Sequence, residues 1–170
     1  MATETGVWDL QQVRDKQLAG EWSYDAQEPL SLYSYGYNGQ GQLGLNNKTG
    51  VPGYTQLPGV WKSVGFGGQD FSSGVKTSGA LFTWGPGSYG QIGNNKANAD
   101  ADNGYSSPKQ MGTATDWNQS ASIRESGAAT KTTGELWMWG QNDKGALGQN
   151  DRTQRSLGYN NWGDWICLFG

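Results

Sequence analysis

The sequence has no histidine and a single cysteine, Cys167. Without histidine it can form neither a Ser-His-Asp triad, nor a Cys-His pair, nor a zinc site with a histidine ligand. One cysteine excludes an internal disulfide, and its neighbours Ile166 and Leu168 indicate a small core residue rather than a nucleophile. These absences predict a protein with no catalytic residues and no cofactor.

Charge and long apolar runs are also scarce. Charged residues make up 16% of the 170 residues, the net charge is −3, and lysine and arginine form no basic stripe. Nucleic-acid binding needs clustered positive charge, so this class of partner is disfavoured. No apolar run reaches membrane length and no signal peptide begins the chain, so we expect no membrane insertion.

What the sequence does contain is a repeat rich in aromatic residues and glycine. An aromatic residue followed by glycine occurs three times, 49 and 55 residues apart, at Tyr35-Gly36, Trp84-Gly85 and Trp139-Gly140. A glycine-rich loop follows each pair. A period near fifty residues indicates one supersecondary unit that is copied, and each copy is too small to bury its apolar face alone.

The repeated unit has the residue pattern of β-strands. Aromatic-rich strands are expected at 32–35, 80–84 and 135–139, and the last two follow turns that end in glycine. Further strands open at Trp61, Trp117 and Trp165. We therefore predict an all-β array of about three units, incomplete at both ends. A closing strand comes first, with Leu32, Tyr33 and Tyr35, and an opening strand comes last, with Trp165, Ile166 and Leu168.

Residues 1–29 differ from the rest, because acidic residues are frequent and glycine and proline are few. Asp9 reads as an N-cap, and the spacing that follows predicts a short helix at about 10–19. We divide the chain into an N-terminal anchoring segment, 1–29, and a β-repeat domain, 30–170. The candidate anchor residues are Trp8, Leu10, Val13, Leu18 and Trp22.

The segments 32–45, 58–92 and 107–148 resemble RCC1-like (regulator of chromosome condensation) repeats. They carry the family's pattern of Trp-Gly, Asn-x-x-Gly-Gln-Leu-Gly, Trp-Lys-x-Val and Lys-Thr-x-Gly; the strand at Trp117 departs from it most. The resemblance implies units of a seven-bladed β-propeller. Seven units would need more than twice this length, so one chain cannot close such a ring.

Residues 6–22 resemble the leader of structural proteins from marine bacteriophages, especially cyanophages. The resemblance implies a non-enzymatic virion protein made in the host cytoplasm, such as a capsid decoration, a fibre, or a tail or neck adaptor. Its partners would be capsid, portal or tail proteins. The alternative is a lectin-like or protein-binding β-repeat module that is not tied to a virion.

Three further expectations concern binding. Tyrosines in or beside predicted loops could contact a host glycan or receptor, or else pack between repeats: Tyr37, Tyr54, Tyr89, Tyr105 and Tyr159. Asn98, Asp100 and Asp102 alternate as calcium ligands do, but they lack the glycine and glutamate of an EF-hand, so a solvated loop is favoured and no metal site is expected. Open strand edges favour a homo-oligomer, namely a trimer in which strand 32–36 pairs with strand 165–169 of another subunit. The alternative is closure of the same strands within one chain.

Overall fold

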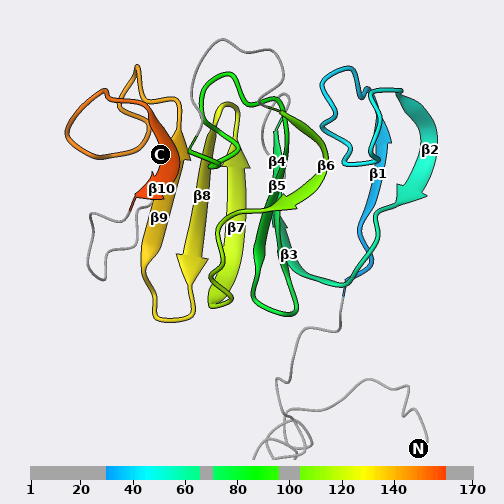
Figure 1. Cartoon of the computed structure of the whole chain (residues 1–170), viewed down its shortest axis with the longest axis horizontal. Coiled ribbons are helices and arrows are strands. Elements are labelled where there is room, and N and C mark those ends of the chain that lie inside the picture. Colours follow the sequence, from blue (N-terminus) through cyan, green and yellow to red (C-terminus); the bar gives the residue numbers. More distant parts are fainter. Residues whose placement is uncertain (1–29, 66–70, 96–103, 160–170) are drawn as a thin grey trace, which may run out of the picture.

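The computed structural model describes residues 30–65, 71–95 and 104–159, and the regular structure in these segments is all β. Ten strands form three antiparallel sheets that stand side by side (Figure 1). One sheet has two strands, and the other two have four each. The predicted all-β array of incomplete repeats is therefore confirmed.

In each sheet the strands are paired in chain order. The sheets consist of β1 (Tyr33–Gly36) and β2 (Val51–Gln56); of β3 (Trp61–Gly65), β4 (Ser72–Lys76), β5 (Leu81–Gly85) and β6 (Tyr105–Gln110); and of β7 (Trp117–Ile123), β8 (Ser126–Lys131), β9 (Leu136–Gly140) and β10 (Arg155–Tyr159).

The two-stranded sheet is the outer half of a unit. Strands β1, β5 and β9 all end in the aromatic–glycine pair, and each is followed by a loop and a last strand, β2, β6 or β10. The expected hairpins β4–β5 and β8–β9 are present, as are the tryptophan strands β3 and β7. The described array thus has half a unit followed by two complete units.

The last strand of each unit was not predicted from the sequence. Of the tyrosines expected in or beside loops, Tyr54 lies within β2, Tyr105 begins β6 and Tyr159 ends β10. These strands pair on one side only, so backbone hydrogen bonds hold them without an alternating apolar pattern. An edge strand also tolerates proline, as at Pro52 and Pro108.

The Lys-Thr-x-Gly segments are the hairpin turns. In the first, the Gly79 amide donates to the Lys76 carbonyl at 2.8 Å, and Gly79 has φ +81°. A Cβ on Gly79 would collide with the Thr115 carbonyl, so the close approach of the next unit requires glycine here. The Lys76 ammonium lies 5.3 Å from the Trp61 ring centroid, and Lys131 lies 5.4 Å from that of Trp117.

The core lies between the sheets rather than within one. Trp61 and Trp84 of the second sheet pack with Leu32 and Leu57 of the first unit. The next core cluster joins the two complete units in the same way: Phe71, Val75, Leu81, Ile92, Trp117, Ala129 and Trp139. Each unit therefore depends on its neighbour for burial, as in other repeat proteins.

Two tryptophans also hydrogen-bond to the preceding unit. The indole N–H of Trp84 donates to the Gln42 carbonyl at 2.8 Å, and that of Trp139 donates to the Gln91 carbonyl at 2.7 Å. Tyr35 holds the same position at the end of β1, and 59% of its surface is exposed. Among the described residues the junction is therefore formed twice, and the equivalent side chain of the first unit, Tyr35, is exposed.

A second pair of hydrogen bonds runs in the opposite direction. The Asn46 amide donates to the Ser106 carbonyl at 2.7 Å, and the Asn95 amide donates to the Ser156 carbonyl at 2.9 Å. Deeper in the junction of the complete units, the hydroxyls of Ser73 and Ser122 are 2.9 Å apart and buried. In both junctions, the loop of one unit is thus hydrogen-bonded to the outermost strand of the next unit.

Several predictions concern residues outside the described segments. These are the anchor residues Trp8, Leu10, Val13, Leu18 and Trp22, the calcium candidates Asn98, Asp100 and Asp102, and the strand with Trp165, Ile166 and Leu168. The sheet order bears on the predicted pairing of strand 32–36 with strand 165–169. In both complete sheets a middle strand separates the tryptophan strand from the aromatic–glycine strand, so the repeat offers no precedent for direct pairing of 32–36 with 165–169.

Candidate functional site: the loop face

Three loops leave the same end of their sheets, at the upper edge in Figure 1. The first loop is 37–50, the middle loop is 86–104, described up to residue 95, and the third loop is 141–154. We call the surface that they form the loop face. Loops on a rigid β scaffold are common binding sites, so their geometry is the basis for a functional argument.

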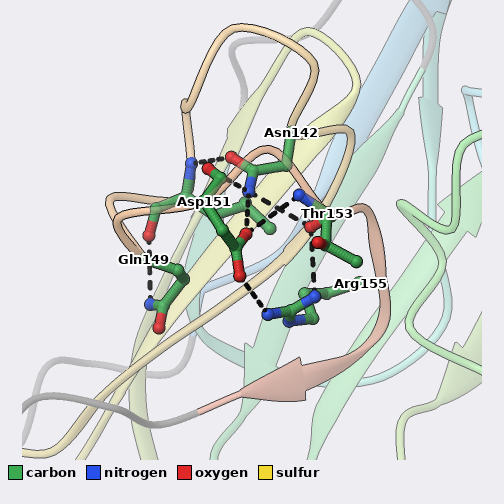
Figure 2. Close-up of polar contacts among 6 residues, drawn as sticks. Asn142, Gln149, Asp151, Thr153 and Arg155 are labelled. Carbon is green, nitrogen blue, oxygen red and sulfur yellow. Dashed lines mark hydrogen bonds and ion pairs between the residues drawn. The ribbon is translucent and has the colours of Figure 1, made fainter.

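A buried asparagine fixes the third loop (Figure 2). The Asn142 Nδ2 group donates to the Asp151 carbonyl at 3.1 Å, to Asp151 Oδ1 at 3.0 Å and to the Thr153 carbonyl at 3.1 Å. Its Oδ1 atom accepts from the Leu147 amide at 2.9 Å. We call this set of contacts the asparagine clamp; it joins both halves of the loop through one side chain.

The first loop has the same clamp. The Asn38 Nδ2 group donates to the Asn47 carbonyl at 2.9 Å, to Asn47 Oδ1 at 3.1 Å and to the Thr49 carbonyl at 3.2 Å, while Oδ1 accepts from the Leu43 amide at 2.9 Å. Asn38 and Asn142 have no exposed surface. Buried amides with full sets of partners hold a loop in one conformation.

The middle loop lacks the clamp, because Gly87 stands where the other loops have asparagine. The Gly90 amide still donates to the Gly87 carbonyl at 3.1 Å, as the Gly41 amide does to the Asn38 carbonyl at 2.9 Å. The middle loop therefore has the same turn hydrogen bond as the first loop, although glycine at position 87 has no side chain to reach across the loop. The segment from Gly87 to β6 is also longer than its counterparts.

Asp151 and Arg155 add charge to the third loop (Figure 2). Asp151 Oδ1 accepts from the Thr153 amide at 2.9 Å, and Asp151 Oδ2 lies 2.7 Å from an Arg155 guanidinium nitrogen. The Thr153 amide, followed by the Arg155 side chain, lowers the pKa of Asp151 below its ordinary value. In the first loop, Asn47 stands at the position of Asp151, so that loop has no corresponding carboxylate.

The candidate contact tyrosines differ in exposure. Tyr37 and Tyr89 lie on the first and middle loops, and 71% and 40% of their surfaces are exposed. Tyr54 is 77% exposed on β2, where its ring meets that of Tyr35 edge-on with centroids 4.8 Å apart. Tyr105 is half-buried and packs against both core clusters. Tyr159 lies at the end of β10. Tyr37 and Tyr89 are thus brought to the loop face, whereas Tyr105 belongs to the core.

A cleft of about 360 Å³ opens where the first unit meets the second. It is largely apolar, and its walls come from β1, the first loop, and the sheet that contains Trp84. The lining residues are Leu32, Tyr33, Ser34, Tyr35, Gln42, Leu43, Leu57, Phe71, Ser72 and Trp84. None of these described lining residues is an acid, a base or a cysteine, so they offer packing rather than chemistry.

Neither a metal centre nor a membrane span is found in the part of the chain that the structure describes. Among those residues, no three His, Cys, Asp or Glu side chains are grouped to hold an ion. Within the same segments no helix is long and apolar enough to cross a bilayer.

Comparisons with known proteins support the fold. No family model matches the chain. The probable E3 ubiquitin-protein ligase HERC4 of rat and that of mouse are each 26% identical to it over 148 residues, covering 82% of this chain and 13% of the relative. The chain therefore spans about an eighth of the length of these curated relatives.

Solved structures also support the fold. Human WBSCR16 superposes with a TM-score of 0.65 at 22% identity, covering 79% of this chain and 34% of that one. Yeast RCC1 (Prp20), solved bound to Kap60, superposes with a TM-score of 0.66 at 18% identity, covering 78% and 33%. These likenesses confirm the RCC1-like repeat fold that the sequence motifs predicted, as an incomplete propeller.

The asparagine clamp and the tryptophan–loop hydrogen bonds were missed in the sequence. A signal for the clamp exists: Asn38 and Asn142 each precede an Asx residue by nine positions and a threonine by eleven. No comparable signal marks the acceptors of the tryptophans, because Gln42 and Gln91 accept through their backbone carbonyls.

Proposed function

We propose that the chain is a non-enzymatic protein-binding module, in which the repeat array is the scaffold and the loop face is the contact surface. The observation that carries the proposal is the division of the aromatic residues. Trp61, Trp84 and Trp139 are fully buried in the junctions, whereas Tyr37 and Tyr89 project from loops on one face.

The chemistry of that face suits a protein partner. Tyrosine combines a large apolar ring with a hydroxyl and loses little conformational entropy on binding, so it is frequent in interfaces. The clamp fixes the conformation of the first loop in the free protein. Less conformational entropy is therefore lost on association. Yeast Prp20p, which has this fold, has been solved in a study of its binding to Gsp1p and histones. That protein therefore supports the class of function, not a particular partner.

The test compares a double variant, Tyr37→Ala with Tyr89→Ala, against Lys48→Ala as a control on the same face. Each protein is cross-linked in the cells that produce it, and the captured proteins are identified by mass spectrometry. We expect the wild type and the control to capture the same specific partner and the double variant to lose it. Equal capture by all three would contradict the proposal, and a glycan-array signal lost only in the double variant would favour a lectin-like module.

A second candidate places this module on a bacteriophage particle. The observation that favours it is the leader at 6–22, with its resemblance to virion proteins, in front of a repeat domain. In this setting Trp8, Leu10, Val13, Leu18 and Trp22 would anchor the chain to capsid, portal or tail proteins, and the loop face would contact a host glycan or receptor. Proteomics of purified particles tests this. We expect the chain to be present in the particles, and we expect deletion of residues 1–25 to abolish its incorporation. Full incorporation of the deletion variant would refute the anchor.

A further inference from the structure

Within the described segments, the third loop presents an unfilled copy of a junction that is filled twice, at Trp84 and at Trp139. At the filled junctions, Cβ atoms on Gly41 and Gly90 would lie 2.7 and 2.9 Å from the Cα atoms of Ser106 and Ser156. A Cβ on Gly145, the corresponding glycine of the third loop, would meet no atom of the described residues within 4 Å. Among these residues, the unit that covers each of the first two loops has no counterpart over the third.

The hydrogen-bonding groups of that junction are also unmatched. Ala146 corresponds to Gln42 and Gln91, whose carbonyls accept from the tryptophans, and it is exposed. Asn150 corresponds to Asn46 and Asn95, and all three have φ between 55° and 60°. Asn46 and Asn95 donate to Ser106 and Ser156, but among the described residues the Asn150 amide has no acceptor.

The opposite end of the array carries the complementary half. Tyr35 occupies the position of Trp84 and Trp139, and Pro52 occupies that of Ser106 and Ser156, because Val51, Tyr105 and Arg155 face the same glycine in their sheets. Tyr35 is 59% exposed, and its other exposed neighbours are Tyr33 and Tyr54. The two ends of the described array are thus related as the two sides of each internal junction are.

We propose that the third loop is a docking site for the N-terminal sheet of a second copy of this chain. Tyr35 of the second copy packs over the Ala146 carbonyl, and the Pro52 carbonyl accepts from the Asn150 amide. The contact continues an interface that already occurs within the chain. It goes beyond the proposed function, because it uses the ends of the array and leaves the tyrosines of the loop face free.

The number of copies follows from the superpositions. The chain covers 33% to 34% of each solved chain that it resembles, so about three copies joined head to tail would match the length of one such chain. Head-to-tail contacts close into a ring when the rotation between units fits, and in this proposal the contact between copies repeats the internal junction. The expected assembly is therefore a trimer joined by sheet-to-sheet packing, and it does not require strand 32–36 to pair with strand 165–169.

Substitutions on both sides of the contact test the proposal by sedimentation of the full chain over a range of concentrations. The wild type is expected to form a trimer. Tyr35→Trp restores the indole donor of the internal junctions, so it is expected to tighten association about three- to tenfold, the value of one added hydrogen bond. Tyr35→Ala and Ala146→Arg are expected to weaken it at least about tenfold, while Lys48→Ala leaves it unchanged. Thermal melts under dilute conditions check that each variant is folded.

A wild-type chain that remains a monomer at every concentration overturns the inference, and this includes the case in which residues 160–170 of the same chain cover the third loop. A trimer that is indifferent to both Tyr35→Trp and Ala146→Arg overturns it as well. Loss of partner capture through Tyr37 and Tyr89 concerns only the proposed function, so the two failures are distinguishable.

Discussion

The first and third loops have the same internal structure and opposite surroundings. Asn38 and Asn142 form the same clamp with partners nine and eleven positions further along the chain. The first loop, however, is covered by the next unit, where Trp84 and Ser106 contact it. In the third loop Ala146 is exposed, and a Cβ on Gly145 would meet no described atom within 4 Å. Local sequence therefore determines the shape of each loop, and position in the array determines what the loop contacts.

This difference predicts unequal effects for equivalent aromatic residues. Trp139→Ala removes a fully buried ring and its hydrogen bond to Gln91, so we expect a loss of about 3–5 kcal/mol in the free energy of unfolding. Tyr35→Ala, at the same position of the first unit, is expected to cost less than about 1 kcal/mol in the monomer, as at other exposed sites. Urea unfolding in dilute solution measures both. Similar losses would mean that the Tyr35 side chain is buried in the monomer in solution.

The asparagine clamps provide the next comparison. Alanine at either position leaves buried loop groups without a partner, which costs about 1–3 kcal/mol. We expect Asn38→Ala to lie at the upper end of that range and Asn142→Ala at the lower end, because relaxation of the first loop also disturbs the Trp84–Gln42 contact. Chemical unfolding of the two variants decides this, and a larger loss for Asn142→Ala would contradict it.

Glycine-to-alanine changes separate the cost of backbone strain from the cost of a clash with the neighbouring unit. Gly41 and Gly145 have φ +81° and +77°, so alanine is strained by about 1–2 kcal/mol at both positions. At Gly41 the added Cβ would also lie 2.7 Å from the Ser106 Cα. The loss for Gly41→Ala should therefore exceed that for Gly145→Ala in the monomer, measured as the difference between their unfolding free energies. Equal losses would show that the first loop is not held against β6.

The sequence predicted the parts of this fold that are specified locally. Glycines 79 and 134 mark the hairpin turns, and the tryptophans mark strands β3 and β7. Strands β2, β6 and β10 were not predicted, because an edge strand requires only one partner and tolerates Pro52 and Pro108.

The candidate site was predictable only in part. The exposure of Tyr37 and Tyr89 agrees with their position in glycine-rich loops. The half-burial of Tyr105 depends on packing against two core clusters, which no local pattern reports. Likewise, the clamp depends on backbone carbonyls nine and eleven residues away, and its role appears only once the loop has folded.

The smallest expected effect concerns pH. The pKa of Asp151 is lowered chiefly by the Thr153 amide, so its stabilising contribution is complete above the ordinary value of 3.8 and is lost as the pH falls through the lower, folded-state pKa. Asn47 has no such titration. We expect the amide resonance of Thr153 to shift in acid while that of Thr49 stays constant, as followed by NMR. In Asp151→Asn both resonances should be constant, and a persistent shift there would assign it to another group.

Hydrogen exchange at three equivalent amides tests the central claim, that the third loop is an unfilled junction, most directly. The amides of Asn46 and Asn95 donate across filled junctions at 2.7 and 2.9 Å, so both should be protected at every protein concentration. The Asn150 amide should exchange rapidly in dilute solution and become protected as the chain associates. Protection of Asn150 equal to that of Asn46 in the isolated monomer would contradict the account.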